Sequence, residues 1–285
     1  MIPTEFQYER ATSLEDAIAK LQAANGAGKL IAGGHSLVPL MKLRLSEPTV
    51  LIDIARVPGL AGVSQVGDAI EIGAMTTHHD VATSEVLRDC CPVVAETAAA
   101  IGDPQVRNRG TLGGSLAHAD PAADYPAVIL ALDASIHLTG PQGTRAVGAT
   151  DFFQGVFTVD VAADEILSKV TFNPVRGSAY AKLHQRASRF AIVGVAATLD
   201  VDGGVIKEAR VALTGAASCP SRLTNVEAAL KGQPTSAEVI ASAASGAAES
   251  VEDINGDIHA SAEYRRAMIP VFVKRALELA VERAA

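Results

Sequence analysis

The chain contains two glycine pairs, each bordered by a small hydroxyl residue, at widely separated places. The first stands in Ala32-Gly-Gly-His-Ser36, directly after an apolar run typical of a buried strand, and the second in Thr111-Leu-Gly-Gly-Ser115. Paired glycines permit positive φ and have no Cβ atoms, so backbone N–H groups can approach a bulky anion such as a diphosphate. One pair alone is equally consistent with a tight turn, whereas two such loops can hold one dinucleotide between them.

A doubly wound dinucleotide fold is disfavoured as the source of these loops. Neither loop spells G-x-G-x-x-G, and no suitably placed acidic residue follows. Tryptophan is absent and aromatic residues are 4% of the chain, so the core consists of small residues in closely packed layers. These features favour an α/β or α+β architecture over a bundle of large side chains.

A length of 285 residues predicts two domains. Proline and glycine cluster in Asn173–Gly177, which is the best linker candidate and places a boundary between residues 1–176 and 177–285. Within the first domain, a β-α-β unit covers about 1–56 and a second subdomain about 57–176.

Local patterns predict the elements of each part. In 1–56 they are strands Glu5–Tyr8, Lys29–Ala32 and Thr49–Ile54 and a helix with Ser13 as N-cap. In 57–176 they are a hairpin at Gly67-Asp68, helices Thr77–Leu87, Pro92–Ile101 and Asp124–Leu132, a loop Gly102–Ser115, a hairpin at Gly140–Gly143 and a strand Glu165–Phe172. In 177–285 they are strands Tyr180–Leu183, Ala191–Val201 and Val205–Leu213 and helices Ser221–Leu230, Ser236–Ala248 and Ala262–Ala284. Pro270 is expected to kink the last helix or to mark its true start.

Composition excludes several functions. The net charge of −8 and the lack of a basic run argue against nucleic acid as a partner. No apolar run is long enough to cross a bilayer and the first residues do not resemble a signal peptide, which predicts a cytoplasmic location. Three cysteines, Cys90, Cys91 and Cys219, cannot supply the four thiolates of a [2Fe–2S] cluster, so any such cluster belongs to another chain. No histidine pair has zinc-ligand spacing and no nucleophile elbow occurs, so neither a metal site nor a catalytic residue is predicted.

The segment after the second glycine pair, Asp120-Pro-Ala-Ala-Asp124, has two interpretations. Asp120 before a proline suits a turn, and Asp124 stands where it can cap the next helix. The alternative is that Asp124 provides a carboxylate that accepts hydrogen bonds from a ribityl hydroxyl or from an adenine-side group.

Longer strings make a family resemblance specific. Ala32–Leu45 resembles the medium, FAD-binding subunits of carbon monoxide dehydrogenases and their relatives among the xanthine-dehydrogenase-type molybdenum hydroxylases. The strings Ile72–His78, Ile101–Ser115, Leu138–Gly143 and Tyr264–Arg266 strengthen the resemblance, which extends from the first residues to the last helix. It implies an α+β protein with the two-subdomain FAD-binding fold of the vanillyl-alcohol-oxidase (PCMH) type and a smaller C-terminal α+β domain.

The resemblance also implies a set of FAD-binding residues. The diphosphate segments are Lys29, Leu30, Ile31, Ala32, Gly33, Gly34, His35, Ser36 and Leu37, and Thr111, Gly113, Gly114 and Ser115. Asp124 matches a family FAD contact, Leu167 a backbone contact near the flavin, and Lys182 a lysine beside the isoalloxazine, where a cation stabilises anionic reduced flavin. Phe190, near the ring, replaces the tyrosine usual in carbon monoxide dehydrogenases, which weakens the carbon monoxide assignment more than the flavin assignment.

The function implied is electron relay. A molybdopterin-containing large subunit oxidises the substrate, an iron–sulfur small subunit with [2Fe–2S] clusters carries the electrons, and the FAD of this chain passes them to quinone, NAD or oxygen. The assembly implied is a dimer of heterotrimers in the cytoplasm or at the inner face of the membrane. Carbon monoxide, aldehydes and N-heterocycles all remain open as substrates.

Two other functions are less favoured by the sequence. A stand-alone flavin reductase of the same fold, such as enolpyruvyl-UDP-N-acetylglucosamine reductase, needs a nicotinamide site and a proton-donating acid, and no motif for either is present. A binding or assembly protein that has lost FAD is disfavoured because both glycine pairs are intact.

Overall fold

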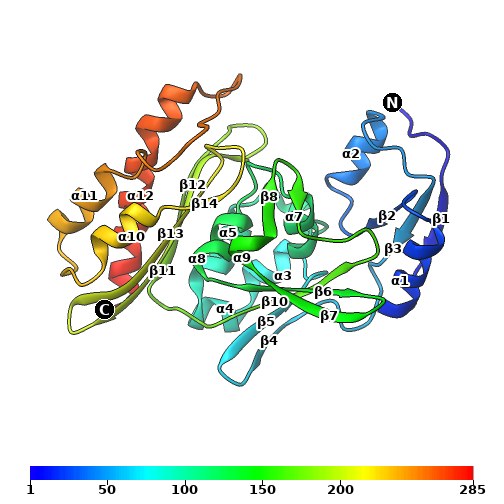
Figure 1. Ribbon diagram of the computed structural model, residues 1–285, viewed down its shortest axis with the longest axis horizontal. Helices are drawn as coiled ribbons and strands as arrows, with labels where there is room; N and C mark the ends of the chain where they lie inside the picture. The colour runs from blue at the N-terminus through cyan, green and yellow to red at the C-terminus, as the bar shows by residue number, and fades with distance from the viewer. Residues whose placement is uncertain (285) are drawn as a thin grey trace.

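The computed structural model describes residues 1–284 and arranges them as three units along the molecule (Figure 1). A small N-terminal lobe stands at one end, a unit of sheet and short helices occupies the middle, and a sheet covered by helices forms the other end. The predicted α+β class is confirmed. None of the helices in the described part of the chain has the length and apolar character needed to span a bilayer.

The N-terminal lobe is a three-stranded parallel sheet in the order β1-β3-β2, packed against one helix. Its elements are β1 (Gln7–Arg10), α1 (Leu14–Ala23), β2 (Gly28–Ile31), α2 (Leu37–Lys42) and β3 (Val50–Asp53). The side chain of Ser13 accepts a hydrogen bond from the amide of Asp16 at 3.1 Å, so the predicted N-cap is confirmed. Helix α2 has no counterpart in the sequence prediction.

The middle unit contains a five-stranded antiparallel sheet in the order β4-β5-β10-β6-β7. Its strands are β4 (Val63–Val66), β5 (Ala69–Gly73), β6 (Ser135–Gly140), β7 (Gly143–Gly148) and β10 (Ile166–Phe172), with a separate two-stranded pair β8 (Phe153–Gly155) and β9 (Thr158–Val159). Its helices are α3 (His78–Thr83), α4 (Glu85–Cys90), α5 (Pro92–Ala100), α6 (Pro104–Arg107), α7 (Leu112–His118), α8 (Tyr125–Ala131) and α9 (Ala149–Phe152).

Two expectations for the middle unit are wrong. The predicted helix Thr77–Leu87 is two helices, because Ser84 adopts extended backbone with ψ 118° and its side chain accepts from the amide of Leu87. The predicted loop Gly102–Ser115 contains α6 and the start of α7, so the second glycine pair lies in the first turn of a helix. Both predicted hairpins and the strand ending at Phe172 are confirmed.

The C-terminal unit is an antiparallel sheet in the order β11-β12-β13-β14 with three helices on one side. The elements are β11 (Ser178–His184), β12 (Ala191–Asp202), β13 (Val205–Thr214), β14 (Ser221–Arg222), α10 (Thr224–Leu230), α11 (Ala237–Ser245) and α12 (Ala262–Ala284). The predicted helix from Ser221 is wrong at its start, because Ser221 and Arg222 pair with β13. Helix α12 starts at Ala262 and continues through Pro270, so this proline does not mark its start.

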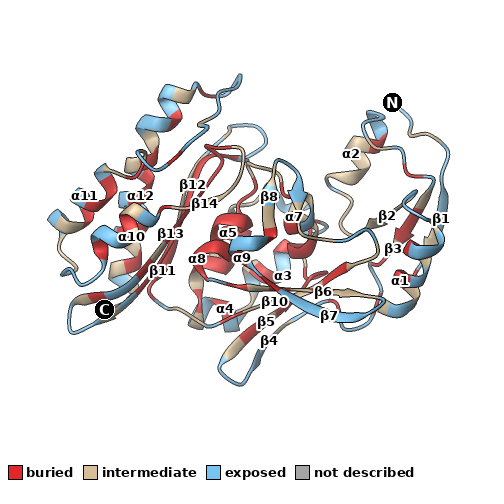
Figure 2. Cartoon of the chain, viewed as in Figure 1, coloured by how far each residue is buried: buried red, intermediate tan, exposed pale blue. Residues whose placement is uncertain are grey.

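The C-terminal sheet is buried on both faces, as the buried strands between two helical layers show (Figure 2). One face, with Val193, Val195 and Leu213, packs against α12. The other face, with Ala196 and Ala212, joins the core of the middle unit beside α5 and α8. Alternate residues of each strand point to opposite faces, so a single strand contributes to two cores.

Candidate functional site

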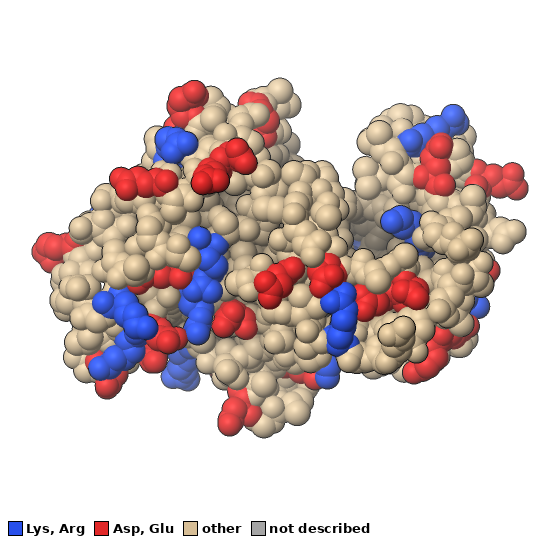
Figure 3. Space-filling view, in the orientation of Figure 1, with Lys and Arg blue, Asp and Glu red and all other residues tan. Residues whose placement is uncertain are grey.

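A cleft of about 730 Å³ lies between the N-terminal lobe and the middle unit. The space-filling view shows the surface hollowed between the N-terminal lobe and the rest of the molecule (Figure 3). Both glycine pairs line the cleft, which is therefore the place where a dinucleotide would meet both loops. The predicted site residues that line it are Lys29, Leu30, Ala32, Gly33, Gly34, His35, Ser36, Leu37, Thr111, Gly113, Gly114, Ser115, Asp124, Leu167 and Phe190. Ile31 and Lys182 do not line it.

The two glycine loops touch each other. A Cβ atom added to Gly33 would collide with the carbonyl of Arg109 and lie 2.8 Å from the Cα of Gly110, immediately before the second loop. Gly34 has φ +74°, a left-handed conformation that glycine adopts without strain. Gly33 is therefore required by loop packing and Gly34 by backbone conformation.

The second glycine pair is fixed by its own packing. A Cβ atom added to Gly113 would lie 2.5 Å from the Cβ of Ala74, and the Gly113 amide donates to the Ala74 carbonyl at 2.8 Å. Thr111 is the N-cap of α7, and its hydroxyl accepts from the Gly114 amide at 3.1 Å. The second loop is thus held against Ala74, the residue after β5.

The amides of the two loops differ in availability. The amides of Leu112, Gly113, Gly114 and Ser115 already donate to protein acceptors. Within residues 1–284, the amides of Gly33, Gly34, His35 and Ser36 donate to no protein acceptor. An anion in the cleft would therefore receive its backbone hydrogen bonds mainly from the first loop.

A buried polar cluster stands at the junction with the C-terminal sheet. The carboxylate of Asp124 accepts from the Tyr180 hydroxyl at 2.5 Å and from the Lys182 ammonium at 2.7 Å, and Lys182 also donates to the Ala100 carbonyl at 3.2 Å. The side chains of Asp124 and Lys182 are only 5% and 6% exposed. Asp124 occupies the N-cap position of α8, but its carboxylate makes no capping bond, so the capping interpretation is wrong.

Burial shifts the ionisation of this cluster. The pKa of Asp124 is raised because the carboxylate is desolvated, although the Lys182 charge opposes the shift. The pKa of Lys182 is lowered, again mainly by desolvation. Burial and the Asp124 charge raise the pKa of Tyr180, so its hydroxyl stays protonated and donates. The pair depends on mutual charge compensation inside the protein.

Sequence reasoning missed several side chains of the cleft. His78 is 5% exposed, its Nδ1 has no partner in the part of the chain described, and burial lowers its pKa to about 4. Phe157, with φ +52°, lines the cleft and its ring lies 5.0 Å from that of His118. Arg107 donates to the carbonyls of Ile101 and Gly102 at 3.0 and 3.1 Å, holding that turn at the cleft wall. The string Ile101–Ser115 pointed to the Arg107 turn, whereas nothing local marked Phe157.

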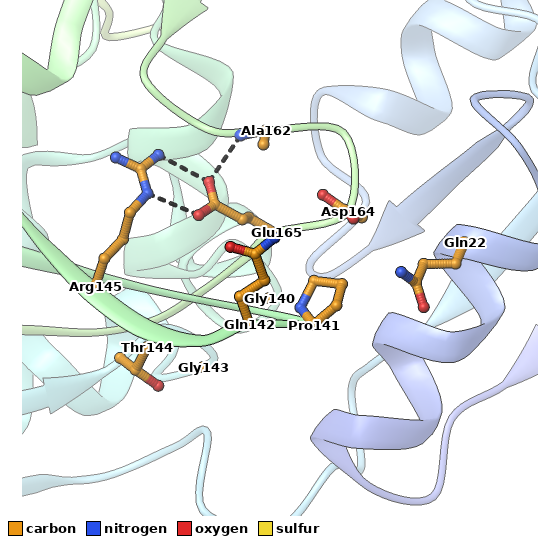
Figure 4. A pocket seen from close by; sticks show the side chains of 10 residues that line it. All are labelled: Gln22, Gly140, Pro141, Gln142, Gly143, Thr144, Arg145, Ala162, Asp164 and Glu165. Carbon is orange, nitrogen blue, oxygen red and sulfur yellow. Dashed lines mark hydrogen bonds and ion pairs between the residues drawn. The ribbon is translucent and has the colours of Figure 1, made fainter.

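A second, more polar pocket of about 490 Å³ lies between α1 and the β6–β7 hairpin (Figure 4). Its one arginine, Arg145, is paired with Glu165 at 2.7 Å and with Asp160 at 2.7 Å. Because these carboxylates already neutralise the guanidinium, this pocket is not an anion site comparable with the cleft.

The large cleft fits FAD by its shape and by its donors. It joins free backbone N–H groups at one loop to an apolar wall that includes Ile166, Leu167 and Val161, as a ligand with a diphosphate and flat rings requires. Its volume lies in the usual range for bound cofactors of about 300–1,000 Å³.

Comparisons with known proteins agree with this geometry. Residues 4–174 match the FAD binding domain in molybdopterin dehydrogenase, and residues 178–280 match the CO dehydrogenase flavoprotein C-terminal domain. The chain is 39% identical to the carbon monoxide dehydrogenase medium chain of Hydrogenophaga pseudoflava, with 100% of both chains covered. It is 37% identical to the nicotine 6-hydroxylase medium subunit of Paenarthrobacter nicotinovorans, with 95% of both covered.

A solved structure gives the same assignment. The structure of carbon monoxide dehydrogenase from Hydrogenophaga pseudoflava that lacks the Mo-pyranopterin moiety contains a chain that matches with a TM-score of 0.95 at 40% identity, and 100% of both chains are covered. The predicted resemblance is confirmed, and the chain belongs to the family of FAD-binding medium subunits of molybdenum hydroxylases, the oxidoreductases that include the carbon monoxide and xanthine dehydrogenases.

Proposed function

We propose that the chain holds the FAD diphosphate on the first glycine loop. The four amides of Gly33 to Ser36 without a protein acceptor in the described chain are the observation that carries this assignment. Ser115 and the Thr111–Gly114 turn would close on the same group from the opposite side of the cleft. The division of labour is unequal because the second loop has already used its own amides.

The flavin end of the cofactor is proposed to lie toward the C-terminal domain. Leu167, Phe190 and Asp124 line the cleft there, and Lys182, which does not line it, is the ion-pair partner of Asp124. Phe190 is 41% exposed and presents an aromatic face without a hydroxyl. The cofactor supplies the redox chemistry, whereas the protein binds it, orients it and adjusts the charge around it.

The partner subunits and the domain division are also part of the proposal. The matched relatives are medium chains or subunits of larger enzymes. We propose an iron–sulfur small subunit as electron donor, a molybdopterin large subunit as the substrate-oxidising partner, a dimer of heterotrimers, and quinone, NAD or oxygen as acceptor, in the cytoplasm or at the inner face of the membrane. The proposed domains are 1–176, with subdomains about 1–56 and 57–176, and 177–285. Relatives named for carbon monoxide and for nicotine leave the substrate open.

An absorbance spectrum with mass analysis of the natively purified chain tests this function. Bound FAD, together with co-purifying iron–sulfur and molybdopterin chains, is the expected result. A folded chain that neither retains FAD nor binds added FAD would contradict the cofactor assignment. A flavin-containing chain that purifies alone and oxidises NADPH would instead support the stand-alone reductase.

A further inference from the structure

The backbone carbonyls of the segment Asp120–Asp124 are hydrogen-bonded to the C-terminal sheet. The Thr214 hydroxyl lies 2.7 Å from the Ala123 carbonyl oxygen and 3.0 Å from that of Pro121. The Gly215 amide donates to the Pro121 carbonyl at 2.9 Å, and the Ala191 amide donates to the Ala122 carbonyl at 3.1 Å. Three consecutive carbonyls of the segment are therefore held by β12, β13 and the residue after β13.

The groups that hold the segment form a row across the sheet. Lys182, Gly194 and Thr214 are register partners on β11, β12 and β13, so they share the face turned toward the middle unit. A Cβ atom on Gly194 would collide with the Tyr180 hydroxyl and lie 2.8 Å from the Thr214 Cγ2. The glycine in the central strand thus makes room for its neighbours to reach the segment.

A buried arginine of α12 is hydrogen-bonded to residues next to this row. Arg265 of α12 is 2% exposed and donates to the carbonyls of Ile192 and Gly215 at 2.8 and 2.6 Å, and to the Asp257 carboxylate at 2.7 Å. Ile192 lies at the start of β12 beside Ala191, and Gly215 directly follows β13. Ala191 and Gly215 are the residues whose amides donate to the segment. The strand ends next to the segment are therefore hydrogen-bonded to α12.

We propose that Thr214 is a positioning residue for the flavin site. Its hydroxyl, with one proton to share, lies within hydrogen-bond distance of two carbonyl oxygens of a segment whose ends, Asp120 and Asp124, both line the cleft. The side chain is 1% exposed, so water cannot replace these hydrogen bonds. The C-terminal domain thereby sets where Asp124 stands, in addition to supplying Lys182 and Tyr180 as its partners. This inference rests on the proposed function, in which FAD binds in the cleft that Asp124 lines.

The test compares two threonines of the same sheet. Thr214→Val keeps the volume and the branched Cβ but removes the hydroxyl. Thr198→Val is the matched control, because Thr198 is 2% exposed and donates to the Ala131 carbonyl at 2.9 Å, at the end of α8 and outside the cleft. Both variants lose a buried hydroxyl at the same domain contact, so equal losses of thermal stability are expected.

The readouts are amide hydrogen exchange of residues 119–124 in the FAD-free full chain and the FAD dissociation constant. Thr214→Val is expected to speed exchange and to weaken FAD binding by roughly tenfold, whereas Thr198→Val leaves both near the wild-type values. Thr214→Ser, which keeps the hydroxyl, should restore slow exchange.

Three outcomes would overturn the proposal. They are equal exchange of residues 119–124 in the two valine variants, unchanged FAD affinity in a folded Thr214→Val chain, or a serine variant as loose as the valine variant. A wild-type chain that binds no FAD would contradict the proposed function instead, and the exchange comparison would still decide the positioning role.

Discussion

At the scale of single residues, Gly33 and Lys182 show two different kinds of constraint. Steric exclusion restricts position 33 to glycine, since a Cβ atom would collide with the Arg109 carbonyl. Position 182 requires a positive charge, since the Lys182 ammonium and the Asp124 carboxylate are both desolvated and each neutralises the charge of the other.

Gly33→Ala is expected to separate the two glycine loops, because its methyl group meets the backbone of Arg109 and cannot be moved aside. FAD retention should fall by at least about tenfold, which corresponds to about 1.4 kcal/mol. Flavin absorbance per folded chain measures the effect. Gly148→Ala, whose Cβ would meet its nearest neighbour at 3.7 Å, is the control and should retain FAD. Equal flavin content in both variants would refute the packing argument.

Lys182→Met is expected to make stability depend on pH through Asp124. Removing the cation raises the already raised pKa of Asp124 further. An acid with a raised folded pKa stabilises the native state below its unfolded pKa of 3.8 and loses that contribution as pH rises through the folded value. The free energy of unfolding should therefore fall by about 3 kcal/mol at neutral to alkaline pH and by less in acid.

Urea denaturation of Lys182→Met at several pH values measures this dependence. The double variant Asp124→Asn, Lys182→Met removes both charges and should show a difference from wild type that changes little with pH. A single variant as insensitive to pH as the double variant would show that Asp124 does not titrate in this range.

At the scale of elements, the second glycine loop is organised by the start of α7. Thr111 caps this seven-residue helix, and its first turn contains both Gly113 and Gly114. The two glycines predict a loop here, because glycine has a low helix propensity. Packing of Gly113 against Ala74 and the threonine cap offset that preference.

Thr111→Val is expected to cost about 1 kcal/mol of unfolding free energy through loss of the cap and to weaken FAD binding as well. Ser236→Ala, which removes the equivalent cap of α11 at the Val239 amide, should cost a similar amount of stability and leave FAD binding unchanged. Chemical denaturation and FAD titration of both variants provide the comparison. Wild-type FAD affinity in Thr111→Val would disconnect the cap from the cofactor site.

At the scale of the whole molecule, ion pairs as well as apolar packing join the C-terminal unit to the FAD-binding part of the chain. Arg283 near the end of α12 donates to Glu96 of α5 at 2.9 Å and to the Ser178 carbonyl at 2.7 Å. Together with the Lys182–Asp124 pair, this places ionic contacts at two separate parts of the same interface. The two units should therefore unfold in one cooperative transition.

The chain purified without its partners is expected to contain no stoichiometric iron. Its three cysteines are free, and burial raises the pKa of Cys91 to about 12, which disfavours the thiolate that binds iron. Metal analysis of the single chain by mass spectrometry is the measurement. Iron at one or more atoms per chain would place part of the electron relay in this subunit.

The family, the two glycine loops and most of the elements could be predicted from the amino-acid sequence. These depend on local features, namely glycine pairs, an N-cap such as Ser13, hydrophobic period and turn residues, and each is visible within a short window. Short windows gave wrong bounds at Ser221, which pairs with β13, and in the helix that contains Gly113, which packs against Ala74, because distant contacts decide both. At Ser84 the predicted helix divides for a local reason, since Ser84 caps the second of two helices.

The arrangement of the site depends on long-range contacts that the sequence does not reveal. Long-range contacts make Asp124 the partner of Lys182 and Tyr180 instead of a helix cap, which was one of its two predicted roles, and bring Phe157 and His78 to the cleft. The amides of Gly33 to Ser36 in the first glycine loop have no protein acceptor within residues 1–284, whereas those of Leu112 to Ser115 in the second do. Long-range packing also places the Thr214 hydroxyl beside the carbonyls of Pro121 and Ala123, in the segment before α8. These facts arise from contacts between residues far apart in the chain, and no local pattern records which distant strand a side chain will face.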